Sequence, residues 1–121
     1  MSKINIKDKL QTFSDYWNPR IVGELNGQLV KLAKFKGEFV WHHHENEDEL
    51  FLVIEGSFEM HYRDKVVKLN AGEFIIVPKG IEHKPVAKEE VSVLLFEPKD
   101  TLNTGNIINE LTKNNLNKID E

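Results

Sequence analysis

The chain has 121 residues, 40% of them hydrophobic and none of them cysteine, and its formal net charge is −4. This length buries one core and no more, and the 16 basic residues form no cluster with interleaved aromatics, so we expect one domain without disulfides that does not bind nucleic acid. The N-terminus has no signal-like apolar core and the longest apolar run, Leu50–Ile54, cannot span a bilayer, so we expect a cytoplasmic protein with no membrane contact.

The N-terminal segment, residues 1–18, has the pattern of one amphipathic helix. Its apolar residues recur at helical spacing, at Ile6, Leu10, Phe13 and Trp17. Ser2 is a candidate cap, and Asn18-Pro19 would end the helix because proline cannot continue it. We therefore predict a short N-terminal helical extension before the main body.

Residues 19–105 have the pattern of strands separated by turns. Runs rich in β-branched and aromatic residues lie at Ile21–Leu25, Gln28–Phe35, Phe39–His44, Leu50–Ile54, Ser57–Tyr62, Lys65–Leu69, Phe74–Val77, Val86–Ala87 and Val91–Phe96. Turn residues such as Asn26-Gly27 and Ala71-Gly72 separate them. Many short strands at such regular turn spacing indicate a sandwich or a barrel.

The last segment, residues 106–121, begins with Ile107, Ile108 and Leu111 at helical spacing and then becomes rich in Asn and Lys. We predict a C-terminal helical tail whose end frays.

The histidine triplet His42-His43-His44 is the most informative feature of the chain. In a strand, successive side chains point to opposite faces, so His42 and His44 project together while His43 points away. A solvated run is the alternative, and the acidic turn at residues 45–48 does look solvated, so none of its residues is expected to bind a metal. The position in mid-chain argues against a purification tag.

Two further residues complete a candidate metal site. Glu49 begins the next apolar run, where a short connection can bring its carboxylate beside the two imidazoles. His83 follows Pro78-Lys79-Gly80, and proline with glycine makes a tight turn that can hold a ligand in place. Three neutral imidazoles and one carboxylate suit one divalent transition metal, among Mn, Fe, Co, Ni, Cu and Zn. We therefore predict His42, His44, Glu49 and His83 as metal ligands.

The chain resembles the cupins, a family recognised by two motifs. The first runs glycine, His-x-His, glutamate, glycine, and reads here Gly37, His42, His44, Glu49 and Gly56. The second runs glycine, Pro-x-Gly, histidine, asparagine, and reads here Gly72, Pro78, Gly80 and His83. Gly37 stands one residue closer to His42 than is usual, and Ala87 stands where asparagine is usual. Neither position is a metal ligand in the family.

This resemblance implies an all-β fold, a double-stranded β-helix or jelly-roll barrel at residues 19–105, with a short N-terminal helix and a C-terminal helical tail. The sequence around Asn18-Pro19-Arg20 and after Glu97 is similar to short single-domain bacterial cupins, some of which are labelled mannose-6-phosphate isomerase-like. Cupins with three histidines and one glutamate include both oxygenases and isomerases, so the resemblance implies chemistry of one of these kinds. Fold likeness alone does not decide between them.

The barrel predicts which residues face inward. If the side chains of His42 and His44 point into the barrel, strand alternation also points Val40 inward. It then leaves Phe39, Trp41 and His43 on the outer face. Inward Glu49 likewise takes Phe51 and Val53 inward and leaves Leu50, Leu52 and Ile54 outside. Such apolar outer stripes need a cover, either the N-terminal helix or a second subunit, so we expect a homodimer.

Three functions remain open from the sequence. The first is a metal-dependent enzyme acting on a small molecule, and the second is a non-catalytic sensor or binding protein that holds a small ligand through the metal. The third is a structural barrel with an incidental metal. A divalent ion with one carboxylate carries formal charge +1, which favours an anionic ligand. Spacing identifies no acid or base beyond the ligands, because Lys31, Lys34, Tyr62 and Glu82 are eligible but expected at the surface.

Overall fold

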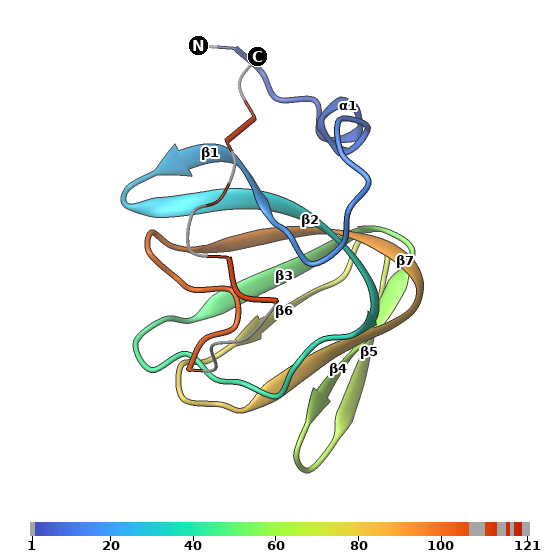
Figure 1. The fold of residues 1–121 in the computed structure, drawn as a ribbon, viewed down its shortest axis with the longest axis vertical. Coiled ribbons are helices and arrows are strands. Elements are labelled where there is room, and N and C mark those ends of the chain that lie inside the picture. Colours follow the sequence, from blue (N-terminus) through green and yellow to red (C-terminus); the bar gives the residue numbers. More distant parts are fainter. Residues whose placement is uncertain (1, 107–110, 114–115, 117, 120–121) are drawn as a thin grey trace.

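A single curled antiparallel sheet makes up most of the computed structural model, which describes residues 2–106, 111–113, 116 and 118–119 (Figure 1). Its elements are α1 (Ile6–Leu10), β1 (Arg20–Leu25), β2 (Gln28–Glu38), β3 (Glu49–Glu55), β4 (Ser57–Tyr62), β5 (Val66–Asn70), β6 (Phe74–Val77) and β7 (His83–Pro98). The strand order is β1-β2-β7-β3-β6, with β4 pairing with β5 and β7. The long strand β7 thus pairs with β2, β3 and β4 and closes the sheet around one interior, which confirms the predicted all-β jelly-roll.

Local turn chemistry explains several strand bounds. The hairpin between β1 and β2 pairs Leu25 with Gln28, which leaves Asn26 and Gly27 as a two-residue turn. Both have positive φ, 50° and 77°, the backbone that an Asn-Gly hairpin turn requires. The predicted runs Val86–Ala87 and Val91–Phe96 are parts of the one strand β7, which continues through residues 88–90 across an irregularity in its pairing with β2.

The predicted N-terminal helix is much shorter than residues 1–18. Helix α1 ends at Leu10, and its cap is Asn5, whose side chain accepts a hydrogen bond from the Asp8 backbone N–H, rather than Ser2. Phe13 is buried beside Leu10 all the same, and Trp17 enters the main core. The apolar spacing therefore marked buried residues correctly, but their tertiary contacts, rather than a continuous helix, place them.

The predicted strand Phe39–His44 does not form. After Glu38 the chain leaves the ladder with β7, and only an isolated bridge between His42 and His83 remains. Because the period of two is lost, Phe39 lies in the core instead of on the outer face, and Val40 only packs against that core. His42 and His44 are nevertheless buried and His43 is half-exposed, as alternation predicted.

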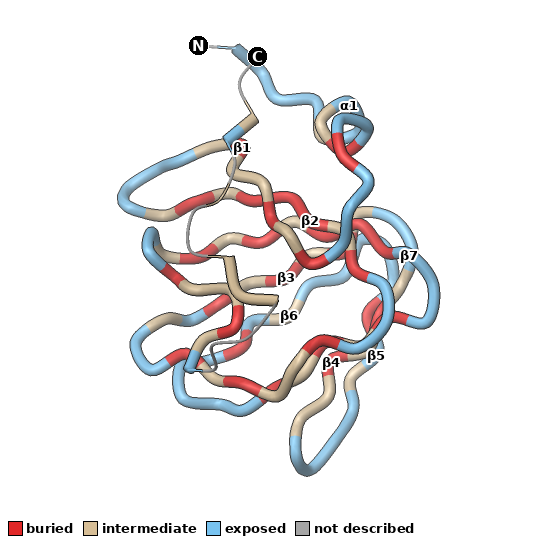
Figure 2. The backbone as a smooth tube through the Cα atoms, viewed as in Figure 1, coloured by how far each residue is buried: buried red, intermediate tan, exposed pale blue. Residues whose placement is uncertain are grey.

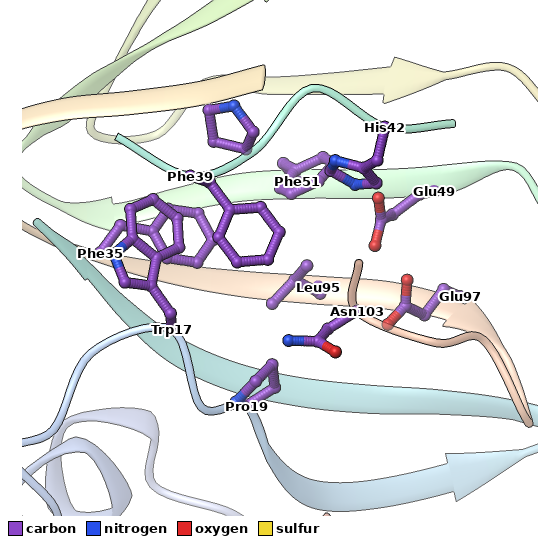
Figure 3. A pocket seen from close by; sticks show the side chains of 11 residues that line it. Trp17, Pro19, Phe35, Phe39, His42, Glu49, Phe51, Leu95, Glu97 and Asn103 are labelled. Atoms are coloured by element: carbon purple, nitrogen blue, oxygen red, sulfur yellow. The ribbon is translucent and has the colours of Figure 1, made fainter. Parts of the chain in front are cut away.

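The main core fills the interior of the barrel and is mostly aromatic and aliphatic. Buried residues recur along the strands that surround it (Figure 2). Trp17 stacks on Phe35 and Phe39, with ring centroids 4.4 and 4.8 Å apart, at one end of this core (Figure 3). Phe51 and Val53 face inward with Glu49, as predicted. The core thus reaches to the residues of the candidate site.

A second, smaller core lies outside the sheet under α1. It is built from Leu10, Phe13, Val22 and Leu32, and Ile54 packs against it. The helix therefore covers only one end of the outer stripe on β3, and Leu50 and Leu52 remain half-buried.

The chain after β7 runs across one end of the barrel as far as Asn106. Of the residues on which the C-terminal helix was predicted, Ile107 and Ile108 lie outside the described residues, and Leu111 is in a turn. In the part of the chain that the structure describes, no helix is long and apolar enough to cross a membrane.

Candidate metal centre

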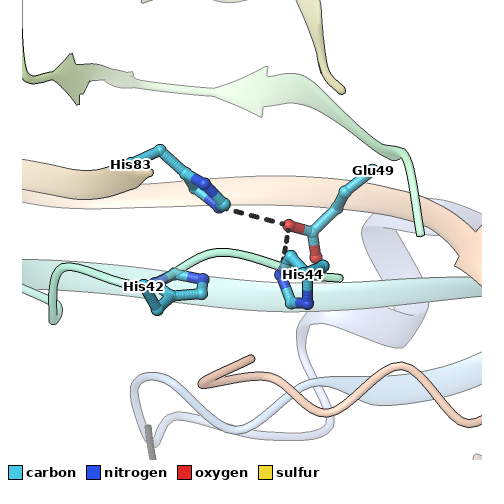
Figure 4. A group of neighbouring side chains, drawn as sticks. All are labelled: His42, His44, Glu49 and His83. Atoms are coloured by element: carbon cyan, nitrogen blue, oxygen red, sulfur yellow. Dashed lines mark ion pairs between the residues drawn. The ribbon is translucent and has the colours of Figure 1, made fainter. Parts of the chain in front are cut away.

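Four side chains that are distant in sequence converge inside the barrel (Figure 4). His42 and His44 come from the loop between β2 and β3, whereas Glu49 and His83 are the first residues of β3 and β7. All four are buried, and one ligand atom from each lies within 4.8 Å of the others. The structure thus brings together all of the residues predicted as ligands.

Backbone carbonyls orient two of the imidazoles. The Nδ1 atom of His42 lies 2.8 Å from the Val40 carbonyl oxygen, and that of His83 lies 2.8 Å from the Ile81 carbonyl oxygen. Because a carbonyl only accepts, each Nδ1 carries the proton and donates it, which leaves Nε2 with the lone pair that a metal needs. Hydrogen bonds of this kind commonly fix the tautomer and orientation of metal-binding histidines.

Several donor atoms of the cluster are buried without a hydrogen-bond partner in the described part of the chain. They are both ring nitrogens of His44, Oε1 of Glu49 and Nε2 of His83. Glu49 Oε1 lies 3.2 Å from His44 Nε2 and 3.6 Å from His83 Nε2, close enough for electrostatic attraction but without hydrogen-bond geometry. Leaving one such atom unpaired costs about 1–3 kcal/mol. A divalent cation bound by one ring nitrogen of His44, by Glu49 Oε1 and by His83 Nε2 would satisfy all of them except the second His44 nitrogen, so the donor set fits a metal.

The electrostatics of the cluster favour the metal-binding protonation states. Burial, and next the electrostatic interaction with the neighbouring His83, lower the pKa of His42 to about 4, so its imidazole is neutral at pH 7. Burial by itself would raise the pKa of Glu49, but its interactions with Glu97, His44 and His83 outweigh this effect and hold that pKa well below its usual range. Glu49 is therefore a carboxylate.

A buried ion pair next to the cluster was missed by sequence reasoning. Lys31 Nζ lies 2.6 Å from Glu97 Oε1, and both side chains are only 2% exposed, so the prediction of Lys31 as a surface residue is wrong. Burial, followed by the charge of Glu49, raises the pKa of Glu97 well above its ordinary value. Strand alternation was the signal that could have found the pair, because Lys31 shares the inward face of β2 with Ala33, and Glu97 shares that of β7 with Leu95.

The other eligible acid and base groups lie away from the cluster. Lys34 is half-buried and donates to the Phe13 carbonyl oxygen. Tyr62 is also half-buried, and Glu82 is exposed and paired with Arg63. None of the three is among the residues that line the cavity beside the ligands.

A narrow cavity adjoins the cluster, with about 30 Å³ of space open to water-sized molecules (Figure 3). Its polar end is formed by His42, Glu49, Glu97 and Asn103. Its remaining wall is aromatic and aliphatic and includes Trp17, Phe35, Phe39, Phe51 and Leu95. The site therefore combines a ligand set of three imidazoles and one carboxylate with a small space that is mostly apolar.

The fold and the cluster together define a jelly-roll barrel with a candidate metal centre inside it. Residues 28–97 match the family model of the cupin domain, which covers more than half of the chain. The chain belongs to the cupin family.

Two relatives and one more distant structure are similar to the chain. It is 39% identical over 80 residues to YdbB, an uncharacterized protein of Bacillus subtilis (strain 168), in a match that spans 65% of each chain and thus somewhat less than two thirds of that relative's length. The crystal structure of a cupin-2 domain containing protein from Shewanella frigidimarina is 47% identical, with a TM-score of 0.79 over 79% of this chain and 94% of that one. Hydroquinone 1,2-dioxygenase PnpCD, in complex with Cd²⁺ and 4-hydroxybenzonitrile, shares the fold at 19% identity, with a TM-score of 0.65 over 78% of this chain and 71% of that one.

Proposed function

We propose that this protein binds one divalent transition metal through His42, His44, Glu49 and His83 and uses it to act on a small molecule that carries an anionic group. The observation that supports this most directly is the convergence of buried donor atoms that have no other partner. Four ligands leave one or two positions open on a five- or six-coordinate metal, and a metal with open positions acts as a Lewis acid or as a docking point for substrate oxygen atoms. The sequence leaves two kinds of chemistry open, oxygenase-like and isomerase-like, and both use such a metal centre.

The residues around the cluster favour the oxygenase-like alternative. The cavity wall offers aromatic and aliphatic side chains, while Asn103 has its amide occupied by the Leu111 carbonyl and the Lys113 backbone N–H. A sugar would need several free hydrogen-bonding groups around its hydroxyls, because unpaired polar groups are costly in a buried site. The chain's own contribution is then to hold the ligands in their neutral or anionic forms and to limit water at the apolar end.

A non-catalytic, metal-dependent binding or sensing role is the second candidate. The segment after β7 supports it, because Asn106 exchanges two hydrogen bonds with the backbone of His43 and covers the loop that carries two of the ligands. A covered site suits retention of a ligand better than rapid exchange.

Elemental analysis of protein purified without an affinity tag tests the proposal. We expect one metal ion per chain in the wild type and a loss of most of that metal in His44→Ala and His83→Ala, since each variant removes a ligand. His43→Ala is the matched control, because the half-exposed His43 side chain pairs with Glu45 outside the cluster and should be dispensable. Wild-type stoichiometry in both ligand variants would contradict the assignment.

Ligand binding then separates the two candidate functions. In the metal-loaded wild type, 2-hydroxy acids and 2-keto acids should raise the melting temperature, whereas His44→Ala should show no such rise. Oxygen consumption with any stabilising acid, measured with an electrode, would favour the enzyme. Stabilisation without turnover would favour the binding role.

A further inference from the structure

A second hollow lies between the loop that carries His44 and the chain after β7. It has about 170 Å³ of space open to water-sized molecules. The loop contributes Glu45 and Glu47 to its lining besides His44, and the chain after β7 contributes Asp100 and Asn106. No lysine or arginine is among the described residues that line it, so three carboxylates surround this hollow without a cationic side chain in its wall. We call it the acidic pocket.

Two of the three carboxylates have unmatched charges. Glu45 contacts His43, and Lys99, next to Asp100 in the sequence, pairs with a carboxylate of β1 instead. Glu47 and Asp100 therefore have no ion pair with any residue that the structure describes. Like charges that face one hollow repel each other and attract a cation, and a divalent ion between them relieves that repulsion. The acidic pocket thus favours a divalent cation, whereas it would repel the anionic ligand of the proposed function.

His44 connects the acidic pocket to the metal-binding cluster. It lines the pocket although it is only 3% exposed, and its Nε2 lies 3.2 Å from Glu49 Oε1 (Figure 4). Backbone carbonyls hold Nδ1 of His42 and of His83, but neither ring nitrogen of His44 has a hydrogen-bond partner among the described residues. The two nitrogens of an imidazole point in nearly opposite directions, so Nδ1 of His44 is available on the side away from Glu49. The ring of His44 can also turn without breaking a hydrogen bond to the described part of the chain.

The two spaces beside the cluster differ in what they admit. The cavity between Trp17 and His42 holds roughly two water molecules, since each needs about 10–15 Å³ of such space. The acidic pocket holds roughly ten, more than the about six waters that surround a divalent ion in solution. Most of the cavity wall is aromatic and aliphatic, and an ion there would have to give up its water shell without replacement. The acidic pocket is therefore the space that admits a hydrated ion.

We propose that the acidic pocket captures a hydrated divalent cation and that His44 transfers this ion from the pocket into the cluster. The carboxylates of Glu47 and Asp100 act on the ion through its water shell, so they are not ligands of the centre. His44 replaces one of the bound waters with a ring nitrogen, and the released water returns to solvent. The inference rests on the proposed function, because the transfer needs a cluster that binds a metal.

Stopped-flow binding of Co²⁺ to protein freed of metal and chelator tests the capture step. Capture followed by transfer predicts an observed rate that saturates as the metal concentration rises. The double variant Glu47→Gln/Asp100→Asn removes both charges, and asparagine tolerates the left-handed φ of 74° at position 100. Its half-saturating Co²⁺ concentration should rise roughly fivefold or more, which is the attraction of two unit charges across about 4 Å of water. The maximal rate should stay unchanged, and the difference should shrink in about 1 M salt.

The matched control is the double variant Glu55→Gln/Asp64→Asn, which changes the net charge by the same amount. Glu55 is the last residue of β3, whereas Glu49 is the first, and Asp64 lies in the turn between β4 and β5. Both control positions are exposed. This variant should keep the half-saturating concentration of the wild type. An equal rise in the two double variants, or a wild-type rate that stays linear in Co²⁺ concentration, would overturn the capture step.

A second measurement needs no variant. Zn²⁺ first fills the centre of the wild type, and paramagnetic Mn²⁺ is then added, which binds such ligands more weakly and does not displace Zn²⁺. We expect the backbone N–H signals of Asn46 and Gly105, which both line the acidic pocket, to broaden in NMR spectra at Mn²⁺ concentrations that leave the signal of Glu55 sharp. Equal broadening of all three signals would contradict a cation site in the pocket.

The outcomes separate this inference from the proposed function. One metal ion per chain, with the two double variants alike and no selective broadening, would overturn the acidic pocket and leave the metal centre intact. Selective broadening by Mn²⁺ in a protein that takes up no Zn²⁺ would support the pocket as a cation site, but it would overturn both the transfer by His44 and the metal-dependent function. Selective broadening together with a specific rise in Glu47→Gln/Asp100→Asn supports capture and transfer.

Discussion

His42 shows how burial and one backbone carbonyl determine the chemistry of a ligand. The Val40 carbonyl accepts a hydrogen bond from the Nδ1–H, and the buried surroundings lower the pKa of the ring to about 4. The lone pair of Nε2 is therefore free at neutral pH, and a metal does not have to displace a proton from it. The same burial that prepares the ligand also makes its protonation costly.

We predict that the metal-free protein loses stability in mild acid because of His42. An unfolded histidine titrates near pH 6.5 and folded His42 near 4, so between these values the unfolded state binds the extra proton and is favoured. The contribution of His42 is complete above pH 6.5 and is lost as the pH falls toward 4. Urea unfolding of chelator-treated protein should show that the wild type loses about 2 kcal/mol more than His42→Gln between pH 7 and pH 5. Equal losses in the two proteins would mean that His42 titrates normally.

The ligands were found from the sequence, and their neighbours Lys31 and Glu97 were not. His42 and His44 are two residues apart, and His83 follows a proline-glycine turn, so local patterns located them. Lys31 and Glu97 are 66 residues apart, and the general tendency of lysine to be exposed outweighed the alternation that placed Lys31 inward. Only the fold itself could bring this ion pair beside Glu49.

At the scale of elements, strand prediction succeeded where both ends carry turn residues. β4 and β6 have the predicted bounds, Ser57–Tyr62 and Phe74–Val77. The run Phe39–His44 looks equally strand-like, but it has no neighbour to complete a ladder, and its backbone hydrogen bonds go to scattered residues, Pro85, His83, Gly80 and Asn106. Pairing is a tertiary property, so a residue pattern alone could not exclude this strand.

The segment after β7 acts as a strap over the ligand loop. The backbone N–H of Asn106 donates to the His43 carbonyl (3.1 Å), and the Asn106 side chain accepts from the His43 N–H (2.9 Å). Gly105 lies against the same carbonyl with a φ of 58°, and a Cβ there would overlap it and come within 3.1 Å of the His42 ring. The close approach of strap and loop thus depends on glycine.

We predict that Gly105→Ala weakens both the fold and metal binding. The matched control is Gly27→Ala, whose φ of 77° gives similar backbone strain but whose added Cβ would meet nothing within 4 Å. Strain alone should cost each variant about 1–2 kcal/mol of unfolding free energy. Gly105→Ala should lose more than Gly27→Ala in urea unfolding, and only Gly105→Ala should need a higher metal concentration for half-saturation. The same losses in both variants would show that the strap moves aside without consequence.

At the scale of the whole molecule, the apolar surface on the outer face of the sheet differs from the one that the sequence predicted for contact between two copies of the chain. The stripe predicted at Phe39 and Trp41 does not exist, because Phe39 is in the core and Trp41 lies under Arg63. Ile54 is partly covered by the small core under α1. The apolar surface continues in the other direction instead, since Leu52 pairs with Phe74 and Leu50 pairs with Ile76 on the edge strand β6. We call these residues, Leu50, Leu52, Phe74 and Ile76, the β3–β6 face.

We predict a homodimer in which the β3–β6 faces of two copies pack together. Phe74 is 61% and Ile76 53% exposed, and they adjoin the half-buried Leu50 and Leu52 on the next strand, so a monomer would leave a contiguous apolar patch at a sheet edge. A two-fold contact buries the same patch on both partners. An apolar patch can pack against an identical patch because the contact brings no like charges together. Multi-angle light scattering at micromolar concentration should therefore give twice the mass of the 14.0 kDa chain.

Two exposed positions test the choice of face. Ile76→Glu should give a monomer, because it would bury a carboxylate in the contact, and it should fold normally because Ile76 is exposed in the single chain. Val66→Glu is the matched control, since Val66 is equally exposed at 52% but lies on β5, which pairs only with β4. It should remain a dimer. If Ile76→Glu stays dimeric the contact lies elsewhere on the molecule, and a wild type with monomer mass at every concentration would rule out dimerisation.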